Sequence, residues 1–489
     1  MGVFLGIDLG TSAVKALLVD ERQTVRATAE VPLATRHPGP LASEQDPAAW
    51  WDAVCAALDA LAASHRDLMS GVAAIGLAGQ MHAAVLLDGA DRVLRPAMLW
   101  NDGRAEAEAA ALNRTGLAPA LGVPAMAGLT APKLLWLARH EPGVIARARS
   151  LLLPKDLIRL RLTGERATDL SDAAGTWLLD QAARRWSEPA AVACGIAPAI
   201  LPPLLEGSAP AGRLRPEPAR RFGLPPGITV AAGGGDTPCG GVGIGAVEDG
   251  RGYVSLGTSA QVFAAGTAYR PAPEAMVHAF CHAVPGRWYQ MAALLNGASV
   301  LGGIARLLGG ASIPALLAEA EAAFSGPSRL LVLPYLAGER TPHDDPHARG
   351  VVFGLSSDTT RAELVQAALE GVAFALADGR DALAAAGTRL DAAGFIGGGA
   401  RSAFWARIVA AALGTELHLY RDGARGPAFG AARLARLALG QDAAEAVLTV
   451  PEVVEVVRPD PALTDVYARR IEAFRALYRA LRPRFRAPG

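Results

Sequence analysis

The 489-residue sequence has no excess of charge of either sign, because 47 lysine and arginine residues balance 47 aspartate and glutamate residues. A chain without a basic or acidic block lacks the electrostatic surface that binds nucleic acid or an anionic membrane. We therefore expect neither of these partners and predict a small-molecule substrate.

Cysteines and long apolar runs are also scarce. The four cysteines, Cys55, Cys194, Cys239 and Cys281, form no CxxC pair. The sequence therefore indicates neither a zinc site nor a disulfide framework, and we expect free thiols in a reducing compartment. No uncharged apolar run reaches the roughly 18 residues of a membrane span. The N-terminus enters an apolar strand pattern without a targeting segment, so the sequence predicts a cytoplasmic protein.

Apolar residues make up 51% of the chain, and its length allows two or three domains with sizeable cores. Strand and helix patterns alternate, which favours an α/β fold. A helix over 361–386 is expected to have one apolar face. The remaining elements predicted from the pattern are strands over 3–7, 13–19, 25–31, 72–77, 228–232 and 395–396, and a helix over 47–63 with Asp46 as its N-cap.

A short repeat divides the chain. Leu9-Gly10-Thr11-Ser12-Ala13 recurs as Leu256 to Ala260, about half the chain later, and each copy follows a short apolar strand. The repeat predicts two duplicated halves, each with a turn of the size that binds a phosphate. The break between the halves is expected near 240–250. Only the first copy is preceded by a carboxylate, Asp8, because Ser255 stands before the second.

The first turn has the groups that bind phosphate and metal. Backbone N–H groups of a glycine turn, with the hydroxyls of Thr11 and Ser12, donate to phosphate oxygens. Lys15 supplies positive charge, and a carboxylate such as Asp8 beside phosphates is typical of a Mg²⁺ site. The alternative is an ordinary hairpin with a capped turn, which the second copy makes less attractive.

Two further glycine runs follow predicted strands. Gly233-Gly234-Gly235 precedes Asp236, and the three glycines let a ligand approach the backbone closely. Asp236 can accept a proton from a substrate hydroxyl, although a solvated Asp after a glycine turn is the alternative. The run 397–402 lies between a strand and a helix, which is a common nucleotide-binding arrangement but weak evidence alone.

Polar and aromatic side chains follow two other strands, at 79–82 and 100–104. Amide, carboxylate, imidazole and indole groups together are typical of a site for a polyhydroxylated substrate. For His82 alone, a satisfied buried histidine is the competing interpretation. The pairs His278/His282 and His343/His347 have i,i+4 spacing but no acidic partners nearby, so no transition-metal site is predicted.

The chain resembles the FGGY family of carbohydrate kinases over essentially its whole length. The resemblance is carried by long motifs: Gly128 to Trp136, which is G-L-T-A-P-K-L-L-W; Tyr335 to His343, which is Y-L-A-G-E-R-T-P-H; and Gly350 to Leu355 with Glu363-Leu364 and Ala367 to Glu370. The stretches 43–47, 78–82, 99–104 and 153–156 are most similar to the bacterial members that phosphorylate D-xylulose at O5.

The resemblance implies an α/β chain of two ribonuclease-H-like domains of the actin/hexokinase/Hsp70 type with ATP in the cleft between them. Residues 1–245 would bind the sugar and carry the catalytic aspartates, and residues 246–489 would bind the nucleotide. By resemblance alone, a homodimer is also expected.

The resemblance also assigns roles to single residues. Asp236 falls on the catalytic base, and Asp8 on the aspartate required near Mg²⁺ and the phosphates; Mg²⁺ would be held by both, through water. The other assignments are Met81, His82, Trp100 and Asn101 for the sugar, Thr11, Ser12, Lys15 and Thr258 for the phosphates, and Gly297, Gly399 and Ala400 for the nucleotide pocket.

One departure from the family pattern bears on specificity. Thr237-Pro238-Cys239-Gly240 stands where related sugar kinases often have Asn-Ala-Ala-Gly, and the stiffer proline loop can change the sugar preference. Three alternatives stay open. They are a kinase of the same family acting on ribulose, glycerol or gluconate, a nucleotide-gated binding protein, and a catalytically silent sugar sensor.

Overall fold

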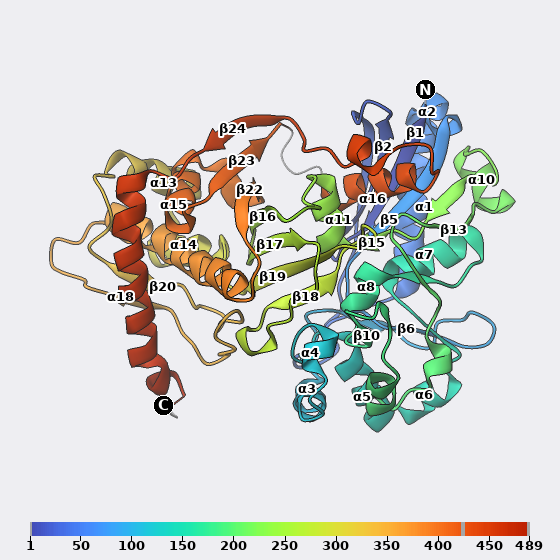
Figure 1. The fold of residues 1–489 in the computed structure, drawn as a ribbon, viewed down its shortest axis with the longest axis horizontal. Coiled ribbons are helices and arrows are strands. Elements are labelled where there is room, and N and C mark those ends of the chain that lie inside the picture. Colours follow the sequence, from blue (N-terminus) through green and yellow to red (C-terminus); the bar gives the residue numbers. More distant parts are fainter. Residues whose placement is uncertain (1, 422–425, 487–489) are drawn as a thin grey trace.

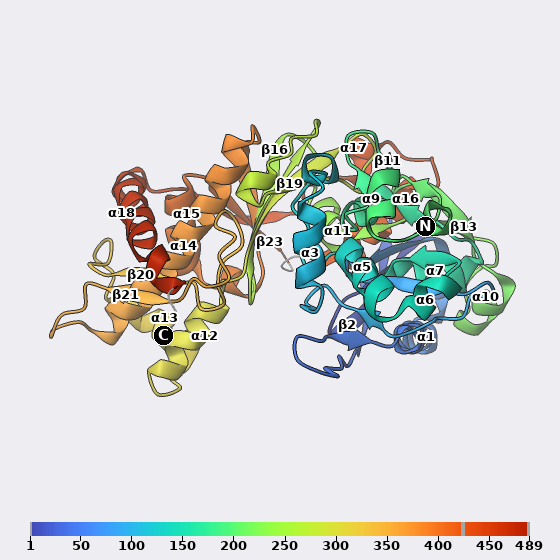
Figure 2. The same cartoon turned by 90° about the horizontal axis from the view of Figure 1, so that it is seen from below.

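The computed structural model describes residues 2–421 and 426–486, which form two α/β halves side by side (Figure 1). Each half is built on a seven-stranded sheet. Seen from below, the halves keep this arrangement, and the long helix α18 (Pro461–Phe485) lies at the outer edge of the C-terminal half (Figure 2). The α/β fold class predicted from the sequence is confirmed.

The N-terminal sheet has the strand order β13-β14-β5-β1-β2-β3, with β15 added to the end of β5. β1 pairs antiparallel with β2 and parallel with β5, and β5 pairs parallel with β14. The strands predicted over 3–7, 13–19, 25–31, 72–77 and 228–232 are confirmed, and two strands that were not predicted, over 210–213 and 234–235, complete the sheet. Their bounds are Val3–Leu9 (β1), Ala13–Asp20 (β2), Val25–Pro32 (β3), Val72–Gly79 (β5), Pro210–Arg213 (β13), Thr229–Ala231 (β14) and Gly234–Gly235 (β15).

The C-terminal sheet repeats this topology in the order β18-β19-β17-β16-β22-β23-β24. β16 pairs antiparallel with β17 and parallel with β22, as β1 does with β2 and β5. The two halves are therefore a structural duplication of a ribonuclease-H-like core. The strands are Gly250–Leu256 (β16), Ala260–Gly266 (β17), His278–Cys281 (β18), Trp288–Leu294 (β19), Leu390–Ile396 (β22), Glu416–Tyr420 (β23) and Val453–Val457 (β24).

The two helices predicted in most detail are α1 (Pro47–Ser64) and α14 (Arg361–Ala385). Asp46 caps α1 by accepting a 2.9 Å hydrogen bond from the Ala48 amide, and Pro47 fills the first position. The middle of α14 is buried on all sides, not on one apolar face as predicted. It lies between the C-terminal sheet and the helices α13, α15 and α18, so its polar residues are buried too.

The remaining helices cover the sheets and fill the ends of the halves. Those of the N-terminal half are Arg66–Ser70 (α2), Glu106–Asn113 (α3), Ala118–Leu121 (α4), Thr130–His140 (α5), Pro142–Arg147 (α6), Pro154–Thr163 (α7), Leu170–Ala174 (α8), Glu188–Ala193 (α9) and Pro216–Phe222 (α10). The others are Asp236–Gly243 (α11), Ser299–Leu307 (α12), Ile313–Ala322 (α13), Ala403–Leu413 (α15), Gly426–Leu437 (α16) and Ala444–Val447 (α17). Within the described residues, none of the helices has the length and apolar character needed to cross a membrane.

Short paired strands complete the list. They are Glu44–Gln45 (β4) with Ala97–Met98 (β7), Val85–Leu87 (β6) with Ser150–Leu152 (β8), Thr168–Asp169 (β9) with Leu204–Leu205 (β12), Leu179–Asp180 (β10) with Arg185–Trp186 (β11), and Leu331–Leu333 (β20) with Val351–Phe353 (β21).

Helix α16 joins the two halves, because it belongs to the second half in sequence but packs on β1 and β5 of the first sheet. A side chain at Gly6 would meet the Ala428 carbonyl oxygen at 1.9 Å, and one at Gly76 would meet that of Ala431 at 1.9 Å. Only glycine in these strands allows the helix to lie this close. The predicted division at residue 245 stays a prediction.

Candidate active site

A cavity of about 700 Å³ lies between the two halves and is lined by both. Residues of the first half that line it are Thr11, Met81, His82, Trp100, Asp236 and Thr237. Those of the second half are Thr258 to Gln261, His278, Phe280, Tyr289, Met291, Ala293 to Leu295, Ala337 and Arg340. A ligand that fills this cavity therefore contacts both halves, as expected for a cleft between duplicated domains.

Asp8 lies near the end of β1, directly opposite Lys15 on β2. Its Oδ1 atom is buried and has no hydrogen-bond partner among the described residues. The pKa of Asp8 is raised to about 7, first by burial and second by the negative charge of Asp236, while Lys15 opposes both. The charge of Asp236 thus lies close enough to disfavour the ionised form of Asp8.

The glycine run places Asp236. Gly233 has a φ of +80°, and a Cβ there would lie 2.0 Å from the Leu77 carbonyl oxygen. A Cβ at Gly235 would lie 2.6 Å from the Met81 sulfur, so glycine is required at both positions. The run forms β15 at the end of β5, and Asp236 is the first residue of α11. The expected open glycine loop is therefore a short strand followed directly by a helix.

The Asp236 carboxylate keeps a raised pKa despite two local donors. Its Oδ1 accepts a 2.7 Å hydrogen bond from the Thr237 amide. Burial nevertheless raises the pKa of Asp236 to about 6, with the Thr237 hydrogen bonds as the opposing cause. A carboxylate of this kind is mostly ionised at neutral pH and is still basic enough to accept a proton from a hydroxyl in a transition state.

The pair Asp8 and Asp236 fits a Mg²⁺ ion. An unpartnered buried carboxylate oxygen beside a second carboxylate is a hard anionic donor set, which is what Mg²⁺ prefers. Across residues 2–421 and 426–486, no group of three or more His, Cys, Asp or Glu could hold a metal. Mg²⁺ commonly uses one or two carboxylates and takes its other ligands from water and substrate phosphates, so two carboxylates are sufficient.

Each phosphate-sized turn is closed by a hydrogen bond from its glycine amide, but the acceptor differs by one position between the two copies. The Gly10 amide donates to the Ala13 carbonyl at 3.0 Å, and the Gly257 amide donates to the Ser259 carbonyl at 3.0 Å. Thr11 of the first turn and Thr258 of the second both line the cavity. Both turns therefore reach the cavity through their threonines, although they are closed by different hydrogen bonds.

The residues predicted for the nucleotide pocket gather around the second turn. A Cβ at Gly297 would lie 2.4 Å from the Ser259 carbonyl oxygen, and one at Gly399 would lie 2.5 Å from a Leu256 methyl carbon. Ala400 lies beside Gly399 in a short 3₁₀ turn after β22. The predicted site residues that do not line the 700 Å³ cavity are Asp8, Ser12, Lys15, Asn101, Gly297, Gly399 and Ala400.

His82 has a conformation that few non-glycine residues adopt, with a φ of +77°. Its Nδ1 lies 2.6 Å from the Gly175 carbonyl oxygen, so this nitrogen is the donor. Burial lowers the pKa of His82 to about 3, which keeps the ring neutral and leaves Nε2 as an acceptor. A side chain at Gly175 would lie 2.6 Å from the ring, so the imidazole has no room to move there.

Trp100 connects the predicted sugar pocket to the first phosphate turn. Its indole nitrogen donates a 3.0 Å hydrogen bond to the Thr11 hydroxyl, which donates in turn to the Gln80 side chain at 3.0 Å. The neighbouring Asn101 is exposed and does not line the cavity, so its predicted sugar contact stays a prediction. Thr11 thus has a structural link to the sugar loops that the motif did not indicate.

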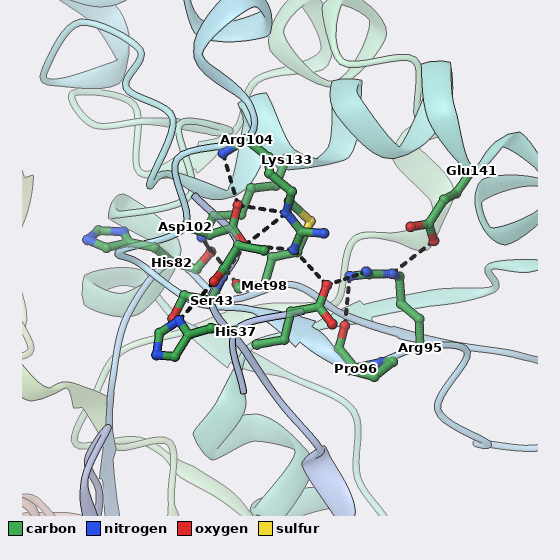
Figure 3. Close-up of polar contacts among 12 residues, drawn as sticks. His37, Ser43, His82, Arg95, Pro96, Met98, Asp102, Arg104, Lys133 and Glu141 are labelled. Carbon is green, nitrogen blue, oxygen red and sulfur yellow. Dashed lines mark hydrogen bonds and ion pairs between the residues drawn. The ribbon is translucent and has the colours of Figure 1, made fainter. Parts of the chain in front are cut away.

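Lys133 connects the predicted sugar loop of His82 to Met98, which lies just before the loop of Trp100 (Figure 3). Its side chain is fully buried and donates to the carbonyl oxygens of His82 at 3.3 Å and Met98 at 3.2 Å. Thr130, on the same helix α5, donates to the His82 carbonyl at 2.8 Å. Burial lowers the pKa of Lys133 to about 7.

A network of ion pairs fixes the loop after Trp100 (Figure 3). Arg104 contacts Asp102 at 2.7 Å and Glu44 at 2.6 Å, and Arg95 contacts Glu44 at 2.7 Å. Asp102 also accepts a 2.8 Å hydrogen bond from the Ser43 amide. The loop is therefore positioned before any ligand binds.

Sequence reasoning missed several residues at the cavity. Lys133 and Arg340 stand inside motifs that carried the family resemblance, but nothing local marks them as neighbours of His82. His278 was considered only as part of a histidine pair. Their proximity depends on strands and helices that meet across the chain, which no spacing rule reveals.

The comparisons with known proteins cover almost the whole chain. Residues 3–243 match the N-terminal domain of the FGGY family of carbohydrate kinases, and residues 252–439 match its C-terminal domain. A xylulose kinase of Klebsiella pneumoniae is 46% identical over 484 residues, which are 98% of this chain and 99% of the relative.

Solved structures agree with this match. The crystal structure of a "xyloylose kinase" from Brucella ovis has a TM-score of 0.96 and 45% identity, and covers 98% of this chain and 99% of that one. A gluconate kinase from Lactobacillus acidophilus has a TM-score of 0.92 and 25% identity, with 98% of each chain covered.

Proposed function

The chain belongs to the FGGY family of carbohydrate kinases, and on that premise we propose that it transfers the terminal phosphoryl group of ATP to the 5-hydroxyl of D-xylulose. The relatives at 45–46% identity over nearly the full chain are named xylulose kinases. The observation that carries the proposal is the single cavity lined by Asp236, by the His82 and Trp100 loops, and by both phosphate-sized turns through Thr11 and Thr258.

Asp236 acts as the general base. Phosphoryl transfer passes through a loose transition state, so the protein contributes mainly positioning and charge. With a pKa raised to about 6, Asp236 is ionised at neutral pH and accepts the proton of the 5-hydroxyl as that oxygen bonds to phosphorus. Its place at the first residue of α11, on a backbone fixed by glycine contacts, keeps the carboxylate at one point in the cavity.

The two turns hold the triphosphate from opposite sides. The backbone amides of 11–12 and 258–259, with the hydroxyls of Ser12 and Thr258, donate to phosphate oxygens. Lys15 adds positive charge. Mg²⁺ bound by Asp8 and Asp236 through water would neutralise phosphate charge and relieve the repulsion between the two carboxylates.

The sugar lies against the Met81–His82 loop and the Trp100 loop. The Nε2 atom of His82 is positioned as an acceptor for a sugar hydroxyl. Trp100 offers an indole ring to the apolar face of the sugar, and Met81 lines the same cavity beside Gly235. Contacts from both halves favour a closed cleft that excludes water, which would otherwise hydrolyse ATP.

A second candidate substrate is gluconate, because a gluconate kinase shares the fold at 25% identity. The Thr237-Pro238 step after the base is the feature of this chain that bears on the choice. A nucleotide-gated binding protein is disfavoured, since such a protein needs no substrate base in the cavity. The expected homodimer and the cytoplasmic location stay predictions.

A coupled ADP-release assay tests the proposal across D-xylulose, D-ribulose, L-ribulose, glycerol and gluconate. We expect D-xylulose to give the highest kcat/KM. A higher kcat/KM with gluconate would move the assignment to the second candidate, and no sugar-dependent ADP release from folded protein would overturn the kinase proposal.

A further inference from the structure

The wall of the cavity formed by the C-terminal half carries polar groups that no protein group satisfies. We call His278, Tyr289 and Arg340 the C-terminal wall. His278 and Tyr289 are 2% and 1% exposed, and the His278 Nδ1 and Tyr289 hydroxyl have no hydrogen-bond partner among the described residues. Both residues line the cavity, although these two polar atoms are themselves buried.

Strand pairing puts these side chains on one surface. His278 on β18 is opposite Met291 on β19, and Phe280 is opposite Tyr289. Side chains alternate between the two faces of a strand, so these four residues share a face, and all four line the cavity. The wall is therefore part of the C-terminal sheet and is rigid.

Arg340 extends this wall with an unpaired positive charge. Among residues 2–421 and 426–486 no hydrogen bond or ion pair reaches its guanidinium group, and the acidic residues that act on its charge without contact are Glu339 and Asp344. The neighbouring Glu339 is already committed, because it accepts from the Leu295 amide at 2.7 Å and the Asn296 side chain at 3.1 Å. A guanidinium cannot lose its proton in a protein, so an unpaired one in a cavity is best satisfied by ligand oxygens.

The backbone that carries Arg340 is held firmly on both sides. The Arg340 amide donates to Glu339 at 2.8 Å. The Thr341 hydroxyl accepts from the Ala293 amide at 3.1 Å and donates to the Met276 carbonyl at 2.8 Å. These bonds attach the segment to the end of β19, so Arg340 is already in place before the ligand arrives.

We propose that the C-terminal wall binds the keto end of D-xylulose, with Arg340 donating hydrogen bonds to the oxygens of C1 and C2. This inference rests on the proposed function and adds to it the residues that determine which sugars fit. The C-terminal half, which was expected to bind the nucleotide, would then also form one wall of the sugar pocket.

The position of Arg340 along the cavity supports this orientation. Burial is the largest cause of the low pKa of His278, about 3, and the positive charge of Arg340 is the next. Arg340 also lowers the pKa of His82, after burial and Lys133. Arg340 is not among the causes of the shift in the pKa of Asp236, which are burial and the hydrogen bonds from Thr237. Arg340 thus lies at the histidine end, away from the base that takes the proton from O5.

Calorimetric titration of the full chain with D-xylulose alone, and with ATP and Mg²⁺ alone, tests the inference. We expect Arg340→Met to weaken D-xylulose binding by about tenfold to a hundredfold, as for a lost hydrogen bond to a charged group, and to leave ATP binding within about twofold. Arg340→Lys keeps the charge but loses the paired donors of the guanidinium group. Its affinity for D-xylulose should lie between those of the wild type and Arg340→Met. The matched control is Arg349→Met, an exposed arginine of the same segment, with wild-type affinities expected.

Tyr289→Phe removes a single hydroxyl and preserves packing if the arginine variants do not fold. A severalfold loss of D-xylulose affinity is expected from it. Unchanged D-xylulose affinity in folded Arg340→Met, or weakened ATP affinity instead, would overturn this inference while leaving the kinase proposal intact. A wild-type protein that binds D-xylulose but never phosphorylates it would overturn the proposed function alone, and one that does not bind D-xylulose would overturn both.

Discussion

The indole nitrogen of Trp100 donates a 3.0 Å hydrogen bond to the hydroxyl of Thr11. Thr11 belongs to the first phosphate-sized turn, and Trp100 belongs to a loop of the sugar pocket. The phosphate-binding and sugar-binding parts of the site are therefore attached to each other directly within the N-terminal half. A change at this contact should affect both substrates.

Thr11→Val removes the hydroxyl and keeps the shape of the side chain. The Trp100 and Gln80 side chains each lose a hydrogen bond, so we expect KM for D-xylulose and KM for ATP both to rise, by about threefold to tenfold. Steady-state kinetics with each substrate varied in turn measures the two values. If only the KM for ATP rose, the link between turn and sugar loop would have no functional role.

Asp236→Asn removes the base while keeping the size of the side chain. We expect kcat to fall by at least about 10²-fold with the fold intact. In the wild type, kcat/KM should decrease as the pH falls below about 6, because protonated Asp236 cannot accept a proton. A pH profile of kcat/KM measures this limb. An Asp236→Asn variant with near-normal turnover would remove Asp236 from the base role.

Asp8→Asn should change how stability depends on pH in the absence of Mg²⁺. The pKa of Asp8 is raised in the folded state, from 3.8 to about 7. The folded state therefore holds the proton more tightly, so this group's contribution to the unfolding free energy is present below pH 4 and is lost between about pH 4 and pH 7. At higher pH the buried carboxylate of Asp8 is charged, and this charge lowers the unfolding free energy. The uncharged side chain of Asn removes that cost.

The expected gain for Asp8→Asn over wild type is on the order of 4 kcal/mol at pH 8 and less than about 1 kcal/mol at pH 4. Urea unfolding at the two pH values, without Mg²⁺, measures both differences, and the comparison of variant with wild type cancels the other titrating groups. A gain that was larger at pH 4 than at pH 8 would contradict the raised pKa.

Lys133 does not line the cavity, so Lys133→Met should act on sugar binding only by loosening the sugar loops. The carbonyl of Met98 loses its buried donor, and that of His82 keeps only Thr130. We expect KM for D-xylulose to rise about tenfold, with KM for ATP unchanged and the unfolding free energy lower by about 1–3 kcal/mol. His140→Gln, an exposed residue at the end of the same helix whose ring contacts its helix neighbour Trp136, is the control and should behave as wild type. Equal effects on both substrates would indicate a general loss of structure instead.

Much of the fold followed from local pattern. The Leu-Gly-Thr-Ser-Ala repeat predicted both sheets, because each copy lies in the hairpin that begins its sheet. The third strand of the second sheet, β19, was not predicted, since the inserted β18 precedes it and breaks the parallel with the first half. The packing of α16 on the first sheet was also invisible, because it depends on Gly6 and Gly76 meeting a helix more than half the chain away.

The candidate site was predicted in a similar, partial way. Residues at strand ends, such as Asp8 and Asp236, could be selected because a carboxylate after a strand and beside glycines has a recognisable chemistry. Lys133 and Arg340 could not, because their importance comes from what they contact or fail to contact in three dimensions. The sugar-facing side of the C-terminal half therefore came only from the structure.

The position of the phosphate on the product tests the central claim most directly. The enzyme is incubated with ATP, Mg²⁺ and D-xylulose, and the product is examined by ³¹P NMR with coupling to protons. We predict a phosphate monoester coupled to the two C5 protons, formed by the wild type and lost with Asp236→Asn. Coupling to the C1 protons, or equal product formation by both proteins, would contradict the account.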